Sequence, residues 1–284
     1  RRLVLDGQLR VDACKGAGAR MEDLLVKIRG RNGVFHADPL QVSLYGGNMS
    51  GEKTVDVQGR VPKAAVRLSV KGVQAGPLLQ DVLKKDFLEG MATADLKISL
   101  AGVTAAQIKK SLNGEGMVTF NDGAVKGIDL AAMARNVKTA FGVEAPGGPR
   151  PRTDFAEVTV PFTITDGLVT VPGAAMKAPF IRLEAAGKAN LVDETLDFRL
   201  VPKAVATIKG QGDEVARSGL LVPILVSGTF AKPVFMPDLK SLLQQEIDKG
   251  LLEKEPVKKL LEKEEVKQFE EPVKTLLKDL MKKQ

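Results

Sequence analysis

Apolar and polar residues alternate along much of the chain. At residues 95–100 the sequence reads Asp-Leu-Lys-Ile-Ser-Leu, and similar runs recur around residues 24–29, 40–44, 66–71, 158–165, 181–185 and 196–200. In an extended strand, successive side chains point to opposite faces of the sheet. The pattern therefore predicts β-strands that each carry one apolar and one polar face.

Short segments with turn-forming residues separate these runs. The predicted hairpin connections are Asn32-Gly33, Gly46-Gly47-Asn48, Asn121-Asp122-Gly123, Asp166-Gly167 and Asp193-Glu194. Tight connections make neighbouring strands antiparallel. We therefore expect a mainly β fold of about a dozen strands, in which one long curved antiparallel sheet forms a hydrophobic groove.

Helical patterns interrupt the strands at a few places. Apolar residues at helical spacing predict short helices at Pro77–Lys85, Thr104–Lys110 (with Thr104 as the N-cap) and Ile128–Phe141. The Pro/Gly-rich segment Glu144–Arg152 is predicted to be a loop. From residue 239 the sequence becomes charged and poor in β-branched residues, which predicts an amphipathic helical C-terminal tail.

These changes divide the chain into three parts. Residues 1–143 form the first β-rich part of the groove, residues 154–238 form a second part that continues the sheet, and residues 239–284 form the tail. The Pro/Gly-rich loop is not interpreted as a true domain linker. Because the chain begins at Arg1 inside a strand pattern, we expect a fragment whose N-terminal part, including any membrane anchor, is missing.

The apolar face is too large for the short helices to cover. Leaving a Val or Leu exposed costs about 1.5–3 kcal/mol relative to burying it. The sheet must therefore close on itself, pack as a sandwich, or curl into a trough that holds something apolar. Aromatic residues make up only 4% of the chain, and the scarcity of large aromatic side chains favours a smooth trough for acyl chains. The groove candidates are Val66, Leu68, Val70, Leu96, Ile98, Leu100, Val158, Val160, Phe162, Leu196, Phe198 and Leu200.

Charge and composition point to no nucleic-acid, metal or catalytic site. The formal net charge is +7, but Lys and Arg are dispersed and lack neighbouring aromatics, which argues against a nucleic-acid surface. The single histidine, His36, cannot build a two-histidine metal site, and the single cysteine, Cys14, in a predicted Gly-rich turn, cannot form an intramolecular disulfide. We therefore expect no enzyme, no metal and no cofactor.

Several segments in a fixed order resemble the C-terminal region of AsmA family proteins. They are residues 72–79, 88–90, 111–116, 122–130, 185–191 with 196–198, and 222–230 with Pro233. The resemblance extends over roughly residues 59–238. It implies a Gram-negative envelope protein that is held in the inner membrane by an N-terminal helix and has a long periplasmic β-rich part. It also implies similarity to bridge-like lipid-transfer proteins, and no catalytic residues.

Two functions follow as hypotheses. The first is a non-enzymatic conduit that carries phospholipid along the groove between the inner and outer membranes and contacts membranes at one or both ends. The second is a scaffold or chaperone-like protein for outer-membrane protein assembly, because a free sheet edge can accept a client strand. The first predicts an open apolar groove, and the second predicts binding through backbone edges.

Overall fold

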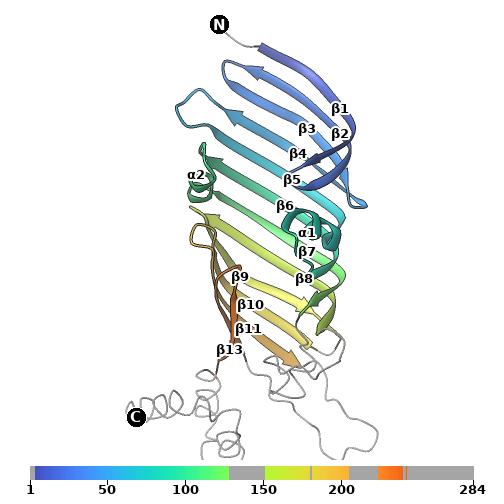
Figure 1. Cartoon of the computed structure of the whole chain (residues 1–284), viewed down its shortest axis with the longest axis vertical. Coiled ribbons are helices and arrows are strands. Elements are labelled where there is room, and N and C mark those ends of the chain that lie inside the picture. The colour runs from blue at the N-terminus through green and yellow to red at the C-terminus, as the bar shows by residue number, and fades with distance from the viewer. Residues whose placement is uncertain (1–3, 128–150, 180, 205–222, 239–240, 242–284) are drawn as a thin grey trace, which may run out of the picture.

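One antiparallel sheet makes up almost all of the structure, which is a computed structural model (Figure 1). It describes residues 4–127, 151–179, 181–204, 223–238 and 241. Thirteen described strands are hydrogen-bonded in sequence order, from β1 at one edge to β13 at the other. At about 4.8 Å per strand, the sheet extends on the order of 60 Å from edge to edge. The predicted mainly β, antiparallel fold is confirmed.

The strands are long in the first two thirds of the sheet and short at its C-terminal edge. Their bounds are β1 (Val4–Gly16), β2 (Ala19–Arg31), β3 (Val34–Leu44), β4 (Gly47–Asp56), β5 (Lys63–Gln74), β6 (Leu88–Ala101), β7 (Asn113–Lys126), β8 (Arg152–Thr165), β9 (Leu168–Lys177), β10 (Ile181–Asn190), β11 (Thr195–Ala204), β12 (Ile224–Gly228) and β13 (Pro233–Pro237). β7 and β8 pair along their length, so the strands on both sides of the Pro/Gly-rich segment belong to one sheet. The division of the chain at residues 143 and 154 stays a prediction.

The predicted turns at Asn32-Gly33 and Asp166-Gly167 connect neighbouring strands, and all four residues have positive φ angles. The turn predicted at Gly46-Gly47-Asn48 lies at Tyr45-Gly46 instead, one residue earlier than expected, because Gly47 already belongs to β4. The prediction at Asp193-Glu194 is also confirmed as a turn, between β10 and β11.

Two sequence predictions are wrong. Asn121-Asp122-Gly123 is not a hairpin but a bulge inside β7, where one extra residue stands opposite β6 and Asp122 has a φ of 49°. Residues with positive φ occur in β-bulges as well as in turns. Cys14 lies within β1 rather than in a Gly-rich turn, because the turn begins only after Gly16.

Two short helices lie on opposite sides of the sheet, each beside the ends of the strands (Figure 1). α1 (Ala75–Leu83) overlaps the predicted helix at Pro77–Lys85. α2 (Ala105–Lys110) begins as predicted after Thr104, whose side chain accepts a hydrogen bond from the backbone N–H of Gln107. We call the side on which α1 lies the α1 rim and the side on which α2 lies the α2 rim. Hairpin connections alternate between them along the chain.

An ion pair and two hydrogen bonds hold α1 against the strands of the N-terminal half. The Nε of Arg20 in β2 lies 2.8 Å from Oδ2 of Asp81, and the hydroxyl of Tyr45 donates to the same oxygen at 2.8 Å. The backbone N–H of Arg20 donates to the Tyr45 hydroxyl oxygen, and the guanidinium lies over the tyrosine ring, 5.8 Å from its centroid. These contacts fix α1 over the ends of β2 and β3, and so fix the α1 rim.

Replacing Asp81 with asparagine is expected to lower thermal stability at neutral pH and to have little effect in acid. The hydrogen bond from Tyr45, followed by that from Arg20, holds the pKa of Asp81 below its usual value. The carboxylate therefore stabilises the fold above its pKa in the unfolded chain, about 3.9, and this contribution is lost as the pH falls through the lower folded value. Thermal melts of both proteins between pH 7 and 3 measure the difference.

Asp95→Asn is the matched control, because Asp95 is an exposed strand residue on the polar face. It is expected to change stability little at any pH. A difference between wild type and Asp81→Asn that stays constant from pH 7 to 3 would contradict the proposed role of the Asp81 charge.

Three predicted segments lie outside the described residues: the helix at Ile128–Phe141, most of the loop at Glu144–Arg152, and nearly all of the tail from residue 239. In the part of the chain that the structure describes, neither helix has the length and hydropathy needed to cross a bilayer.

Candidate functional site

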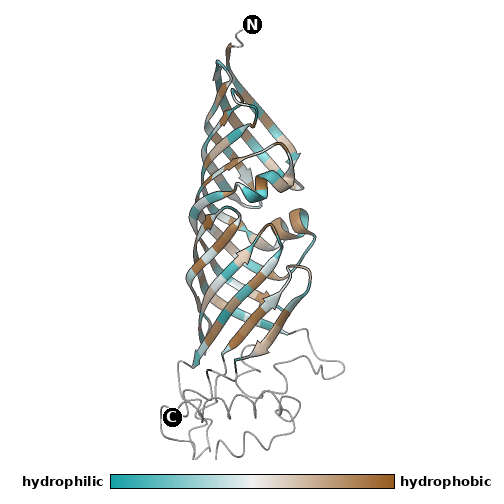
Figure 2. Ribbon diagram, turned by 90° about the vertical axis from the view of Figure 1, so that its left-hand side faces the viewer, coloured by the Kyte–Doolittle hydropathy of each residue, from teal (hydrophilic) through white to brown (hydrophobic). Residues whose placement is uncertain are grey.

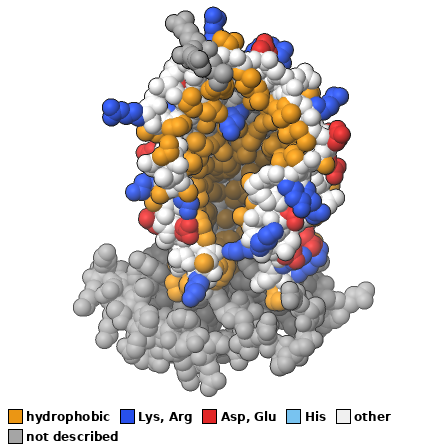
Figure 3. Space-filling view, turned by 45° about the horizontal axis from the view of Figure 1, so that its top comes forward, with side chains coloured by type: hydrophobic (Ala, Val, Ile, Leu, Met, Phe, Trp, Pro, Cys, Tyr) orange, Lys and Arg blue, Asp and Glu red, His pale blue; other side chains and the backbone are white. Residues whose placement is uncertain are grey.

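The sheet is curled, and the hollow that it encloses is apolar. Figure 2 shows hydrophobic and hydrophilic residues alternating along the strands of the curled sheet. Figure 3 shows a hollow lined mainly by hydrophobic side chains, while most Lys, Arg, Asp and Glu side chains lie on the outer surface. We call the hollowed side the inner face. Only one layer of described strands forms this wall.

Strand register places the predicted groove residues of β5, β6 and β8 in continuous rows across the sheet. Val66 pairs with Ile98, Ile98 with Gly114, and Gly114 with Ile164. The next row joins Leu68, Leu96, Gly116 and Phe162, and a third joins Val70, Ala94, Val118 and Val160. The predicted apolar faces of separate strands therefore form one surface.

The remaining candidates fall on the same face. Leu100 pairs with Ala64, and Val158 pairs with Phe120 and Met176. On β11, Phe198 pairs with Gly187, and Leu200 pairs with Ala185 and Ile224. All twelve predicted groove residues are half-buried, including Leu196. They are neither sealed in a core nor fully exposed, as expected for the wall of an open groove, and their contact with lipid stays a prediction.

Glycines on the inner face give large neighbours room to lean across the wall. A Cβ atom at Gly116 would lie 2.8 Å from a methyl carbon of Leu96 and 2.9 Å from the ring of Phe162. The ring of Phe198 lies 2.7 Å from the corresponding point at Gly187. Side chains crowd together on the concave side of a curved sheet, so glycine at these positions accommodates the curvature. This explains why the sequence carries Gly114 and Gly116 at the start of β7.

One end of the inner face is sealed by the chain's own side chains. Phe155, Met176, Ala178, Ile181 and Leu183 form a buried cluster contributed by β8, the β9–β10 connection and its flanking strands, and Phe155 is only 4% exposed. Partly buried side chains pack against it, and these include the groove candidates Val158 and Leu200. The sequence prediction missed this cluster, because Phe155 precedes the alternating run from which the β8 face was predicted. The groove therefore has a closed end toward β10.

The two rims approach each other near this end. Nζ of Lys85, just after α1, donates a hydrogen bond to the carbonyl of Phe230 in the β12–β13 turn at 3.4 Å. A second contact joins two residues of the α2 rim itself. Nζ of Lys109 lies 2.6 Å from Oε1 of Glu194, and the lysine holds the pKa of that carboxyl below its usual value. The curl of the sheet thus brings segments 145 residues apart in sequence into contact across the groove opening.

The outer face is polar and paired. Arg67 contacts Glu52 at 2.8 Å and Lys97 contacts Glu115 at 3.0 Å, both between neighbouring strands. Exposed pairs of this kind contribute about 0–1 kcal/mol each. Their main effect is to keep the outer face hydrated, so the two faces of the sheet differ sharply in what they can bind.

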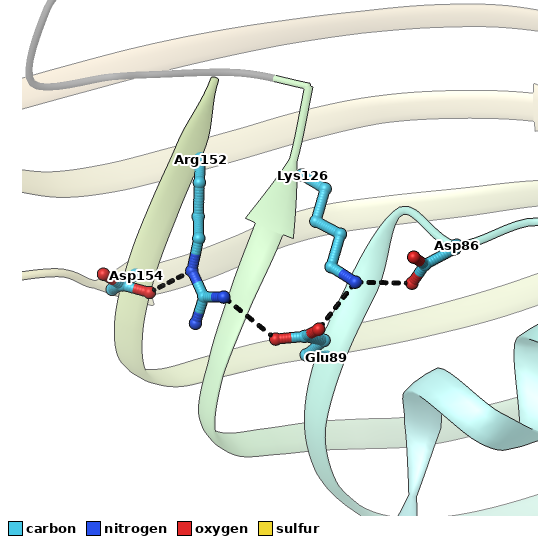
Figure 4. A network of polar contacts seen from close by, with 5 residues as sticks. All are labelled: Asp86, Glu89, Lys126, Arg152 and Asp154. Atoms are coloured by element: carbon cyan, nitrogen blue, oxygen red, sulfur yellow. Dashed lines mark hydrogen bonds and ion pairs between the residues drawn. The ribbon is translucent and has the colours of Figure 1, made fainter. Parts of the chain in front are cut away.

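A larger charge network joins β6, β7 and β8 (Figure 4). Nζ of Lys126 lies 2.7 Å from Asp86 and 2.6 Å from Glu89, and Asp86 is the main cause that raises the pKa of Lys126. Arg152 contacts Glu89 at 3.2 Å and Asp154 at 2.7 Å. Every member has an oppositely charged partner, so the network ties three strands together.

Metal-ligating and nucleophilic groups are scattered. Within the described ranges, no group of three or more His, Cys, Asp or Glu residues could hold a metal ion. The Nδ1 of His36 lies 3.1 Å from the hydroxyl oxygen of Thr54 on the neighbouring strand. Cys14 is half-buried in β1. The inner face therefore stands out as the candidate site by its shape and hydrophobicity.

The chain matches a known protein family and a curated relative. Residues 4–173 match the AsmA family, starting earlier and ending earlier than the segments that carry the sequence resemblance. The chain is 22% identical over 242 residues to Protein AsmA of Escherichia coli (strain K12), an alignment that covers 84% of this chain and 39% of that protein. This chain thus spans less than half the length of that relative. No solved structure gives a significant match. Because the family match extends over more than half of its length, the chain belongs to the AsmA family.

Proposed function

We propose that this chain carries phospholipid along the inner face of its curled sheet, as a non-catalytic part of the Gram-negative envelope. The observation that carries the proposal is a single-layered sheet whose inner face is a row of half-buried Val, Leu, Ile and Phe side chains. Bound acyl chains would remove this surface from water, which stabilises the complex by about 25 cal/mol per Å² of apolar area buried. A lipid cargo therefore supplies the missing second layer.

The sheet is suited to a mobile cargo. Its backbone groups are paired along the ladders, and no buried side-chain N or O atom among the described residues lacks a hydrogen-bond partner. Within the hydrocarbon wall, hydrophobic contact is non-directional, so an acyl chain can slide from row to row without breaking specific bonds. The proposed location is the periplasm, with attachment to the inner membrane through an N-terminal segment and contact with a membrane at one or both ends.

Co-purification and transfer measurements test the proposal. Native mass spectrometry of the detergent-free protein should find bound phospholipid, and the protein should accelerate transfer of a fluorescent phospholipid between donor and acceptor vesicles. A folded protein that carries no phospholipid and transfers none would refute the conduit.

A scaffold for outer-membrane protein assembly remains a second proposal, supported by a different feature. β1 pairs only with β2 within the described sheet, and its Val4 and Leu9 are 66% and 49% exposed. A strand edge of this kind can accept an added strand through backbone hydrogen bonds. Site-specific crosslinks from β1 to an unfolded barrel protein, in the absence of bound lipid, would favour the scaffold over the conduit.

A further inference from the structure

One lysine stands on the inner face among apolar residues. Lys53 in β4 pairs with Ala37 on one side and with Val66 on the other. The same row continues through Ile28 beyond Ala37 and through Ile98 beyond Val66. Side chains at paired positions share a face of the sheet, so the register puts the Lys53 ammonium on the groove side of the wall.

No other charged residue occupies an inner-face position in the described strands from β4 to β13. The inner-face positions of β4 are Gly47, Met49, Gly51, Lys53 and Val55, which alternate with the polar residues of the outer face. The facing positions of β5 and β6 carry Ala, Val, Leu and Ile. A lysine at this position is therefore an exception on an inner face that is otherwise uncharged across these ten described strands.

Lys53 has no hydrogen-bond or ion-pair partner among the described residues. Glu52, its neighbour in β4, points to the outer face and pairs with Arg67. Asp38 follows Ala37 in the β3 bulge and forms no ion pair with Lys53. A lysine on an apolar surface must keep its ammonium hydrated or pair it with an anion. In a filled groove, the cargo can supply that anion.

Lys53 also lies near an opening of the groove. It is close to the end of β4 at Asp56, where the chain leaves the sheet on the α2 rim and enters the β4–β5 loop. An amphipathic molecule whose chains rest against Val66 and Ile98 would place its polar end toward this rim. Lysine binds phosphate as a strong point charge.

We propose that Lys53 binds the phosphate group of a glycerophospholipid while its acyl chains lie on the rows of Val66 and Leu68. The proposal rests on the conduit function and adds a headgroup contact to it. The cargo is thereby a lipid with an anionic phosphate rather than a neutral glyceride. The contact also gives the groove a preferred resting place for a headgroup at the α2 rim.

A purely structural role makes a different prediction. The hydrocarbon stem of lysine can cover apolar surface while the ammonium reaches water. In that case methionine, which is similar in length and uncharged, would replace Lys53 with no change in the preference among lipids. The two roles are therefore separated by headgroup selectivity rather than by stability.

The test compares lipids that have the same acyl chains with and without phosphate. Phosphatidylcholine vesicles containing labelled dioleoyl phosphatidate or labelled dioleoylglycerol are incubated with wild type, Lys53→Met, Lys53→Arg and Lys71→Met. Lys71 is the matched control, an exposed lysine paired with Asn48 on the outer face. Wild type, Lys53→Arg and Lys71→Met should favour phosphatidate by about tenfold, as one charge-assisted hydrogen bond allows. Lys53→Met should take up both lipids about equally.

Other outcomes overturn the inference in distinguishable ways. If Lys53→Met keeps the wild-type preference for phosphatidate, Lys53 does not bind the headgroup, and the proposed conduit function is unaffected. A free-phosphate site would instead bind inorganic phosphate to delipidated wild type, lose it in Lys53→Met, and show no headgroup preference. If wild type takes up neither labelled lipid, the conduit fails together with this contact.

Discussion

Replacing Ile98 with aspartate is expected to abolish phospholipid carriage while leaving the sheet folded. Ile98 is half-buried in the middle of the inner face, between Val66 and Gly114. A carboxylate in contact with hydrocarbon costs about 3 kcal/mol on membrane-insertion scales, which corresponds to a loss of about a hundredfold in binding. The new charge still reaches water when the groove is empty, so folding without lipid remains possible.

Ser99→Asp provides the matched control one residue away. Ser99 is exposed on the outer face, opposite Ala65 and Asn113. It adds the same charge to the same strand without facing the cargo. Vesicle-to-vesicle transfer of a fluorescent phospholipid and native mass spectrometry measure both variants, with circular dichroism to verify the fold. Equal transfer by both variants and wild type would exclude the inner face as the lipid path.

The alternation of residues along the chain predicted strand existence and strand faces well, because period two is a local property. The runs around Leu68, Leu96 and Val160 each predicted their own inner side chains without knowledge of their partners. The size of the apolar face, set against the few short helices, then indicated the groove. What the pattern could not reveal was how the strands align, because register depends on two strands at once.

A bulge explains one of the two wrong predictions. Asn121-Asp122-Gly123 has the composition of a turn, yet it lies inside β7, because the positive φ of Asp122 is accommodated by one extra residue rather than by chain reversal. Gly72 has a similar role in β5, where two residues between Val70 and Val73 stand opposite one residue of β6. Each bulge shifts the phase of alternation, so a simple count of odd and even positions fails beyond it.

The pattern also could not identify the two residues on which the inferences about the inner face depend. Lys53 looks like any solvated lysine until the pairing with Ala37 and Val66 puts it on the inner face. Phe155 precedes the β8 run and joins the sealed cluster only through packing with residues of β9 and β10. Both depend on tertiary neighbours, which a single strand's sequence does not encode.

Phe155 and Phe162 allow a direct comparison of the closed and open parts of the inner face. Both lie on β8 and both point inward, opposite Gly123 and Gly116 respectively. Phe155 is 4% exposed within the buried cluster, whereas Phe162 is half-buried in the groove wall. Phe155→Ala is expected to destabilise the delipidated protein by about 3–5 kcal/mol, because it opens a cavity among packed side chains. Phe162→Ala should cost about half of that or less, because its ring already lies partly in water.

Urea unfolding of both variants without lipid measures this difference, and repeating it with bound phospholipid extends the argument. A ligand that binds only the folded state raises its stability according to affinity and concentration. Lipid should therefore stabilise wild type and Phe155→Ala equally, since Phe155 is sealed off from the cargo, and should stabilise Phe162→Ala less, since that ring would touch the acyl chains. If the two alanine variants lost the same stability and responded equally to lipid, the inner face would not be divided into a structural end and a cargo-bearing trough. The division follows from the proposed conduit, because a trough that released lipid could not also supply the packing that holds the sheet together, and the Phe155 cluster is one place where this chain has such packing.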